Sequence, residues 1–281
     1  MRSLLVIFVM IPISISPQSA TFDFHSPQNI KLFADYLFCD KDYLRAIEQY
    51  EMLQKTFNND TVEFKIMLSY SNLGLYNKSN ELLARFNSNS KIFPDSYLLS
   101  LKNKLINEQN KIIEPAISSF DSAQWKSYNR ISSVSMLYEN VPTISKVKYI
   151  SVFDKDEQST VSFLFDYKFD PPYKSSALAG VMSAVIPGSG KMYVGDWGDG
   201  ISGLLITGLF AFLAYDNFKA NHTTKAWVFT GIGAFFYAGN IYGSIAAAQI
   251  FNAKIDFEFQ NGLKIFLEKE NYFLPEYDFC N

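Results

Sequence analysis

Residues 187–196 read PGSGKMYVGD, and residues 200–215, after three intervening residues, read GISGLLITGLFAFLAY. Neither this apolar run nor the later run over residues 226–253 carries a charged side chain. As helices, the first run with its flanks is roughly 27 Å long and the second roughly 40 Å. A hydrocarbon core is about 30 Å thick, and core helices of soluble domains usually keep a polar face. The sequence therefore predicts membrane spans at about residues 200–218 and 226–252.

The connector over residues 217–225 is short, so the two spans should form an antiparallel hairpin. Gly239 and Gly243 form a G-x-x-x-G pattern, which lets helix backbones approach closely in lipid. Packing inside the hairpin is favoured over a dimer face for these two glycines. Asn240 is a polar group within the apolar run, and we expect it to hydrogen-bond across helices.

The apolar stretch before the glycine-rich segment predicts an interfacial helix over residues 177–187, because Pro187 stops or kinks a helix. A third span through residue 193 is the alternative. A P-loop is excluded, since Val185 and Met192 stand where that motif needs Gly and Ser or Thr. We interpret the segment as a turn at the membrane surface in which Asp196 and Asp199 cap the following helix. The residues that mark this turn are Pro187, Gly188, Gly190, Tyr193, Gly195 and Asp196.

Residues 1–20 have the pattern of a secretory signal peptide: a basic start, an apolar stretch and a small residue at a cleavage site after Ala20. An uncleaved signal anchor is the alternative. Either way the following segment is exported. Two spans then return the C-terminus to the exported side and leave Lys219 and Lys225 in the cytoplasm, as the positive-inside rule favours. We expect the plasma (inner) membrane as the location.

Two segments of the exported part, residues 42–50 and 74–83, are similar to each other. Tyr43 and Tyr76 are 33 positions apart, as are Ala46 and Ser79, which resembles the 34-residue tetratricopeptide repeat. The resemblance implies a helical-repeat domain over residues 21–140. It departs from the family in the missing proline at Asn58 and in Ser for Ala at position 79. The expected repeat-packing residues are Tyr43, Ala46, Tyr50, Gly74, Tyr76 and Ser79.

Residues 141–175 form a predicted junction, with a strand-like run over 159–165 and a stiff Pro171-Pro172 pair at its end. The membrane domain then covers residues 176–253, and a tail covers 254–281. Asn261-Gly262 in this tail is a hairpin signal, but the apolar spacing also fits a helix. We favour a helix that continues from the second span and frays near Asn261.

The chain offers little chemistry. It has two histidines and two cysteines, no zinc-ligand spacing and no nucleophile–base pair, so we expect no catalytic residue, no metal and no cofactor. Its net charge of −3 with mixed signs does not favour nucleic acid. A Cys39–Cys280 disulfide is possible in an oxidising compartment, but a buried free Cys39 and an incidental Cys280 are favoured.

The C-terminal half resembles a bacterial membrane-domain family whose mark is P-G-x-G-x-x-Y-x-G before two transmembrane helices, with Lys191 where Gln is usual. Such domains occur behind exported repeat segments in uncharacterised membrane proteins, which implies an architecture but no activity. The sequence thus predicts a mainly α protein: an exported helical-repeat (tetratricopeptide-like) domain on a membrane-embedded helical hairpin. Its expected role is a non-catalytic interaction scaffold or adaptor for a protein or peptide partner, with the lipid bilayer as anchor and the oligomeric state undefined. The alternative is a membrane-domain role in transport, lipid handling or envelope assembly, with accessory repeats.

Overall fold

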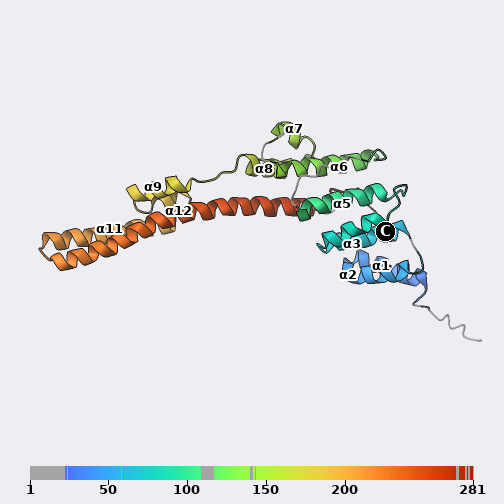
Figure 1. Cartoon of the computed structure of the whole chain (residues 1–281), viewed down its shortest axis with the longest axis horizontal. Helices are drawn as coiled ribbons and strands as arrows, with labels where there is room; N and C mark the ends of the chain where they lie inside the picture. Colours follow the sequence, from blue (N-terminus) through green and yellow to red (C-terminus); the bar gives the residue numbers. More distant parts are fainter. Residues whose placement is uncertain are drawn as a thin grey trace, which may run out of the picture. The chain divides into compact units, whose positions relative to one another are not determined.

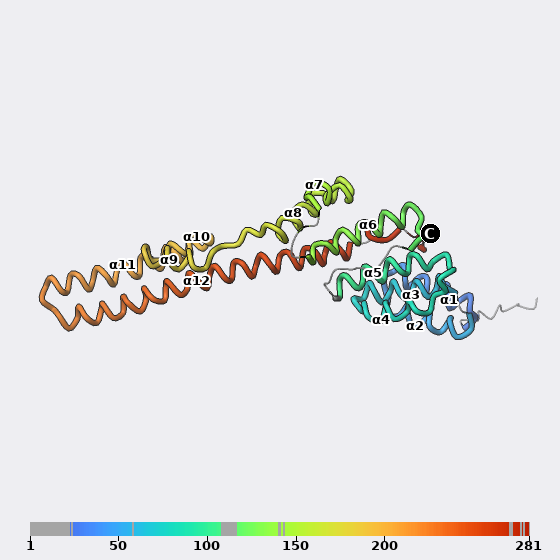
Figure 2. Tube along the Cα trace, turned by 45° about the horizontal axis from the view of Figure 1, so that its top comes forward, coloured from blue at the N-terminus to red at the C-terminus, as the bar shows by residue number. Residues whose placement is uncertain are grey.

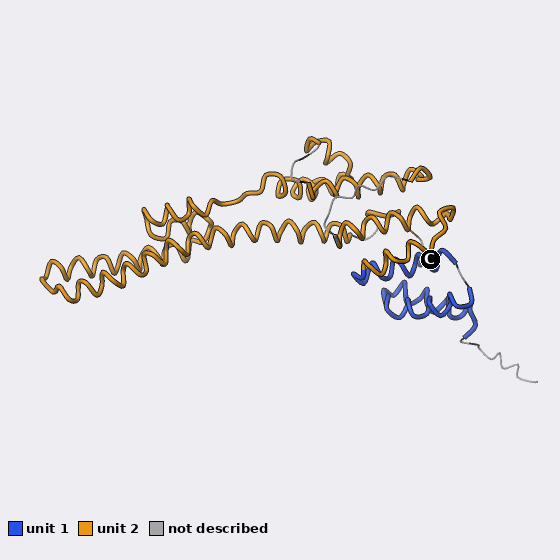
Figure 3. The backbone as a smooth tube through the Cα atoms, in the orientation of Figure 1, with its two compact units in different colours: residues 1–75, 278–281 blue, residues 76–277 orange. Residues whose placement is uncertain are grey.

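The computed structural model describes residues 23, 25–57, 59–108, 117–139, 142, 144–269, 272–275, 277 and 279–280. Every regular element within these ranges is helical, which confirms the mainly α fold class. The chain divides into two compact units, residues 1–75 with 278–281 and residues 76–277 (Figure 3). The predicted signal peptide at residues 1–20 lies outside the described residues.

The first unit is built from α1 (Pro27–Cys39), α2 (Tyr43–Gln54) and α3 (Asp60–Asn72) (Figure 1). Each helix is preceded by a capping residue whose side chain accepts a hydrogen bond from a backbone N–H in the first turn. These residues are Ser26, Asp42 and Asn59. α1 packs against α2, and α2 packs against α3. The residues that fill the core between them are Ala34, Leu37, Ala46, Ile47, Tyr50, Leu53, Val62, Phe64, Ile66 and Met67.

The second unit begins with α4 (Tyr76–Glu81), η1 (Leu82–Arg85), α5 (Phe93–Glu108), α6 (Ser122–Ser135), η2 (Met136–Tyr138), α7 (Lys146–Ile150) and α8 (Gln158–Phe169). The strand-like run predicted at residues 159–165 is wrong, because these residues lie in α8. Val161, Leu164 and Phe165 have helical spacing and are buried in one core with residues from α5, α6 and the C-terminal helix. After α8, the chain through Pro171 and Pro172 is not helical, as expected from the proline pair.

The rest of the second unit consists of α9 (Ser176–Val185), α10 (Ser189–Tyr193), α11 (Trp197–Lys219) and α12 (Thr223–Leu267). α11 and the first part of α12 run side by side as an antiparallel pair, and α9 packs on α12 beyond them (Figures 1 and 2). The turn between α11 and α12 is only three residues long, with Asn221 in the left-handed conformation. This hairpin occupies the position that the two apolar runs predicted.

α12 has 45 residues, which makes it about 68 Å long, more than twice the thickness of a hydrocarbon core. Its last third packs into the core of the second unit through Ile255, Phe259, Leu263, Phe266 and Leu267. The tail was correctly expected to continue as a helix, but the fraying near Asn261 was wrong. Gly262 lies inside the helix, because the apolar residues Phe259, Leu263 and Phe266 on both sides of it are buried in the core.

Candidate functional site

The glycine-rich turn joins α9, α10 and α11 by close backbone contact. α9 ends just before Pro187, as expected, and Gly188 follows with a φ of +85°. A Cβ at Gly188 would lie 2.0 Å from the carbonyl oxygen of Gly200, and one at Gly190 would lie 1.9 Å from that of Ala179. Only glycine fits at these two positions, so the motif is a packing device for three helices.

A chain of buried hydrogen bonds continues from this turn into the hairpin. The Gly190 N–H donates to Ser183 Oγ at 3.0 Å, and the Ser183 and Ser244 hydroxyls share a bond of 2.6 Å. Ser244 Oγ donates to the Asn240 carbonyl oxygen, and Asn240 Nδ2 donates to Thr207 Oγ1 at 3.2 Å. The chain connects α9, α10, α11 and α12, and it confirms the expected hydrogen bond of Asn240 across helices.

Sequence reasoning missed Ser183, Ser244 and Thr207. Their only signal is that each is a small hydroxyl residue inside an otherwise apolar run. Such side chains stabilise helix pairs in apolar surroundings because they can bond across the interface without holding the helices apart.

The other motif residues lie around the outer end of the turn. Gly195 has a φ of +95°, and the side chain of Asp196 accepts a hydrogen bond from the Asp199 N–H, which caps α11 as expected. The Tyr193 hydroxyl accepts a hydrogen bond from the Ser175 N–H, while the Lys174 ammonium lies 4.9 Å from the centre of the Tyr193 ring. These contacts fasten α10 to the start of α9.

The two glycines of the G-x-x-x-G pattern differ in the structure. A Cβ at Gly243 would lie 3.2 Å from Lys191 Cε, so Gly243 gives room to the lysine side chain. At Gly239 no described atom lies within 4 Å of an added Cβ, so the close packing predicted there is absent. Gly203 and Gly180, which the pattern did not single out, make the close approaches to α12: their Cβ positions would lie 2.3 Å from Asn240 Oδ1 and 2.9 Å from Ile245 Cγ1.

The outer surface of α9, of α11 and of the part of α12 that packs beside them is mostly apolar. Among the described residues, one helix, α11, is long and apolar enough to cross a membrane by length and composition. Large apolar side chains on all three helices are exposed on this surface and are not buried in the core of the unit. The exposed set includes Val181, Val185, Leu205, Leu209, Phe212, Tyr215, Trp227, Val228, Phe235, Tyr242 and Ile250.

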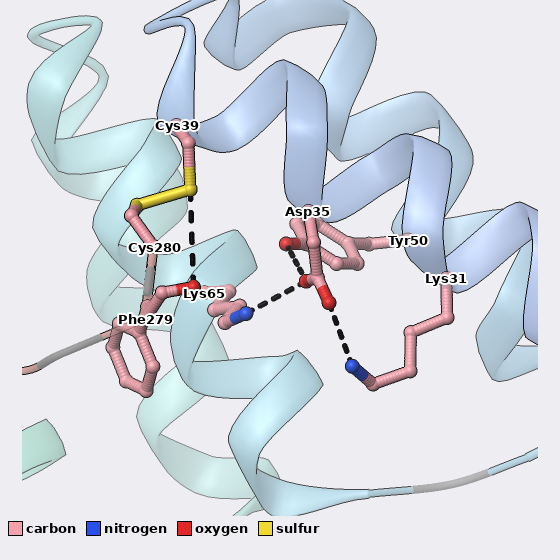
Figure 4. The surroundings of a disulfide bond; sticks show 7 residues. All are labelled: Lys31, Asp35, Cys39, Tyr50, Lys65, Phe279 and Cys280. Atoms are coloured by element: carbon pink, nitrogen blue, oxygen red, sulfur yellow. Dashed lines mark hydrogen bonds and ion pairs between the residues drawn. A yellow bond between two sulfur atoms is a disulfide. The ribbon is translucent and has the colours of Figure 1, made fainter.

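The first unit holds a cluster of charged and aromatic side chains beneath a disulfide (Figure 4). Asp35 accepts hydrogen bonds from Lys31 at 2.6 Å, from Lys65 at 2.7 Å and from the Tyr50 hydroxyl at 2.6 Å. Burial by itself would raise the pKa of Asp35, but these three hydrogen bonds outweigh it and hold the pKa below its ordinary value. Lys65 also lies 4.8 Å from the centre of the Phe279 ring.

Cys39, the last residue of α1, is bonded to Cys280, with 5.6 Å between the two Cα atoms. The interpretation of both cysteines as unpaired was therefore wrong. The two cysteines lie 241 positions apart, and only the folded chain brings them together. Because α1, α3 and the C-terminal residues meet here, the disulfide and Phe279 fasten the end of the chain to the first unit.

The expected repeat-packing residues are divided between the two units. Ala46 and Tyr50 are fully buried in the first unit. Gly74, with a φ of +73°, ends α3: the Leu75 N–H bonds to the Tyr70 carbonyl oxygen, and no described atom lies within 4 Å of an added Cβ.

The remaining three residues also find partners within their own units. Tyr43 contacts Phe38 edge to face in the first unit. In the second unit, Ser79 is buried and accepts a hydrogen bond from Asn103 Nδ2 at 2.9 Å, while the Tyr76 hydroxyl donates to Glu268 Oε1 at 2.5 Å. The tetratricopeptide-like repeat itself stays a prediction.

No group of three or more His, Cys, Asp or Glu side chains suited to a metal ion occurs among the residues that the structure describes. Comparisons of the chain with protein-family models, curated proteins and solved structures find no match.

Proposed function

We propose that this chain is a non-catalytic, membrane-anchored protein whose exported helical part binds a protein or peptide partner. The observation that carries the proposal is the distribution of side chains in the α11–α12 hairpin. Polar groups such as Asn240 and Thr207 are bonded to each other inside the hairpin, while large apolar side chains face outward. That arrangement suits a lipid environment, because lipid tails accept apolar groups but leave polar ones without partners.

The disulfide supports a topology with two crossings. Cys39 and Cys280 must lie in the same compartment to form a bond, and disulfides persist in oxidising compartments such as the exported side of a membrane. A single crossing by α11 would put them on opposite sides. If α12 crosses back, both cysteines are exported and Lys219 and Lys225 flank a cytoplasmic turn.

Labelling single cysteines in a Cys39→Ser/Cys280→Ser chain tests this topology. A cysteine at Asn221, in the tight turn of the hairpin, should react with a membrane-impermeant maleimide only after the cells are permeabilised. A cysteine at the exposed Lys155 should react in intact cells. Labelling of position 221 in intact cells would refute the two-crossing topology.

The partner surface that we propose lies on α1 and α2 of the first unit. Leu32 and Tyr36 are one turn apart on α1 and are largely exposed. Leu44 on α2 is largely exposed too, and Phe33 on α1 and Met52 on α2 are a little under half exposed. Exposed apolar groups gathered on adjacent helices are typical of protein-binding surfaces. The aromatic side chains among them are of the kind that dominates binding energy at such surfaces.

Photo-crosslinking of the full-length protein in its native membranes tests the surface. A photoreactive residue at Tyr36 should give a discrete crosslinked band that Leu32→Glu removes. Val147→Glu is the matched control, since Val147 is also an exposed apolar residue but lies on α7 of the other unit. A band that survives Leu32→Glu, or that Val147→Glu removes equally, contradicts this assignment.

A second candidate function is a role of the membrane domain itself in transport, lipid handling or assembly. The observation that favours it is an apolar crevice of about 290 Å³ between α11 and α12, lined by Phe210, Ala214, Phe229 and Tyr237 among others. Substitutions at Gly188, Gly190 and Tyr193 separate the two candidates. If the protein's activity survives these substitutions but is lost when the first unit is deleted, the partner-binding function is favoured over a role of the membrane domain.

A further inference from the structure

A second cavity, of about 250 Å³, opens beside the glycine-rich turn between α10, α11 and α12. Its mouth carries two opposite charges, Lys191 and Asp199, and Gly239 forms part of its wall. Close helix packing does not require a glycine at position 239, because an added Cβ meets no described atom within 4 Å. The open space beside Gly239 belongs to this cavity.

The charged pair at the mouth is held in place but not saturated. Lys191 Nζ lies 3.4 Å from Asp199 Oδ2, and the lysine stem passes over Gly243, so its side chain is only 19% exposed. An ammonium group has three donors and a carboxylate has two accepting oxygens. One contact between them leaves each group able to bind a second charge of opposite sign.

The wall of the cavity changes from charged to apolar along α11 and α12. Asp199 and Ile206 are seven residues apart on α11, which corresponds to about 10 Å along the helix. The buried amide of Asn240 lies against Gly203, which is between these two residues on α11, and Phe235 and Phe236 of α12 also line the cavity. A ligand that fits such a cavity has a charged end and a hydrocarbon end.

We infer that this cavity binds one zwitterionic phospholipid with a primary ammonium headgroup. Its phosphate contacts Lys191, its ammonium donates to Asp199, and the start of an acyl chain lies against Phe235 and Phe236. A lone anionic headgroup meets Asp199 as a like charge, and a quaternary ammonium has no N–H to donate to the carboxylate. The inference rests on the proposed membrane anchoring of the hairpin.

The test is lipid binding to the full-length protein, purified in a nonionic detergent and observed intact by native mass spectrometry. The probes are phosphatidylethanolamine, phosphatidylglycerol and phosphatidylcholine with the same acyl chains. Phosphatidylethanolamine should be retained about five- to tenfold better than the other two. Equal retention of the three lipids overturns the inference.

Gly239→Leu fills the cavity without displacing a described neighbour, so it should abolish the preference for phosphatidylethanolamine. Gly231→Leu is the matched control, because Gly231 lies on the same helix, also has open space around its Cβ position and does not line the cavity. If Gly239→Leu retains the lipid as well as Gly231→Leu does, the cavity is not the site.

Charge substitutions separate headgroup recognition from cavity filling. Asp199→Asn leaves Lys191 without its carboxylate, so the preference should shift toward phosphatidylglycerol. Lys191→Gln should remove the discrimination among the three lipids. An unchanged preference in both variants overturns the proposed headgroup contacts. If the protein is found in the soluble fraction and retains none of the lipids, both the membrane anchoring and the lipid site are refuted. If the protein is bound to membranes but shows no lipid preference, only the lipid site is refuted.

Discussion

Replacing Gly190 with alanine tests whether close packing at the glycine-rich turn holds α9, α10 and α12 together. The added Cβ would lie 1.9 Å from the Ala179 carbonyl oxygen and 2.8 Å from Ser244 Cβ. The obstacle at Ala179 is backbone, which cannot rotate away as a flexible side chain does. α9 and α10 would have to separate by about 1 Å to restore even the shortest tolerable contact of 3.0 Å.

Two losses contribute to the expected magnitude. Overpacking of a tight interface costs about 1–3 kcal/mol. The bond from the Gly190 N–H to Ser183 Oγ is 3.0 Å long and would break on that separation, which costs about 1 kcal/mol more. We therefore expect Gly190→Ala to lower the free energy of unfolding by about 2–4 kcal/mol.

Thermal unfolding of the purified protein in detergent, followed by circular dichroism, measures the effect. Gly190→Ala should lower Tm by roughly 5–15 °C. Gly208→Ala is the control, because Gly208 lies within α11 and a Cβ there meets no described atom within 4 Å. It should leave Tm unchanged or raise it slightly, since alanine favours helix over glycine. Equal Tm values for the two variants would refute the packing role of the motif.

Three further predictions concern stability. Cys280→Ser opens a covalent link across 241 positions, so it should lower the free energy of unfolding by up to about 5 kcal/mol; a denaturation midpoint that matches the wild type contradicts this. Asp35→Asn leaves the buried Lys65 without its carboxylate and should cost about 1.5–3 kcal/mol at pH 7, the range for hydrogen bonds to charged groups. Because folding lowers the pKa of Asp35, its ionised form contributes to stability above its unfolded pKa, and this contribution is lost as the pH falls through the folded pKa. In urea titrations at acid pH, the free energies of unfolding of the variant and the wild type should therefore converge. Burial lowers the pKa of Lys102, on α5, to about 8. Above pH 8 the unfolded chain therefore binds more protons at this side chain than the folded chain does, so the free energy of unfolding should rise with pH. Lys102→Met should show a smaller rise than the wild type between pH 8 and pH 9.5.

Much of the helical framework was predictable from local sequence signals. The apolar runs placed the hairpin, Pro187 marked the end of α9, and Asp196 marked the start of α11. Each signal acts within a few residues, through hydrophobic spacing, a missing N–H or a cap. The run at residues 159–165 failed because β-propensity was weighed above the helical spacing of its buried residues, and only the core settles that competition.

The candidate site was predictable only in part. The sequence marked Gly188 and Gly190, but a G-x-x-x-G pattern does not reveal that Gly239 borders a cavity while Gly203 makes the close contact with Asn240. It also gave no reason to join Ser183 to Ser244, which are 61 positions apart. Such partners depend on which faces of the helices meet.

By itself, then, the sequence located the two apolar runs of the hairpin, the helix break at Pro187 and the helix cap at Asp196. These features depend only on neighbours along the chain. The tertiary structure alone decided that Cys39 meets Cys280, that the serines link α9 to α12, and that Lys191 and Asp199 form the charged mouth of a cavity. Those pairings arise from contacts among residues distant in sequence, and a contact's energy exists only once the backbone has brought the two groups together.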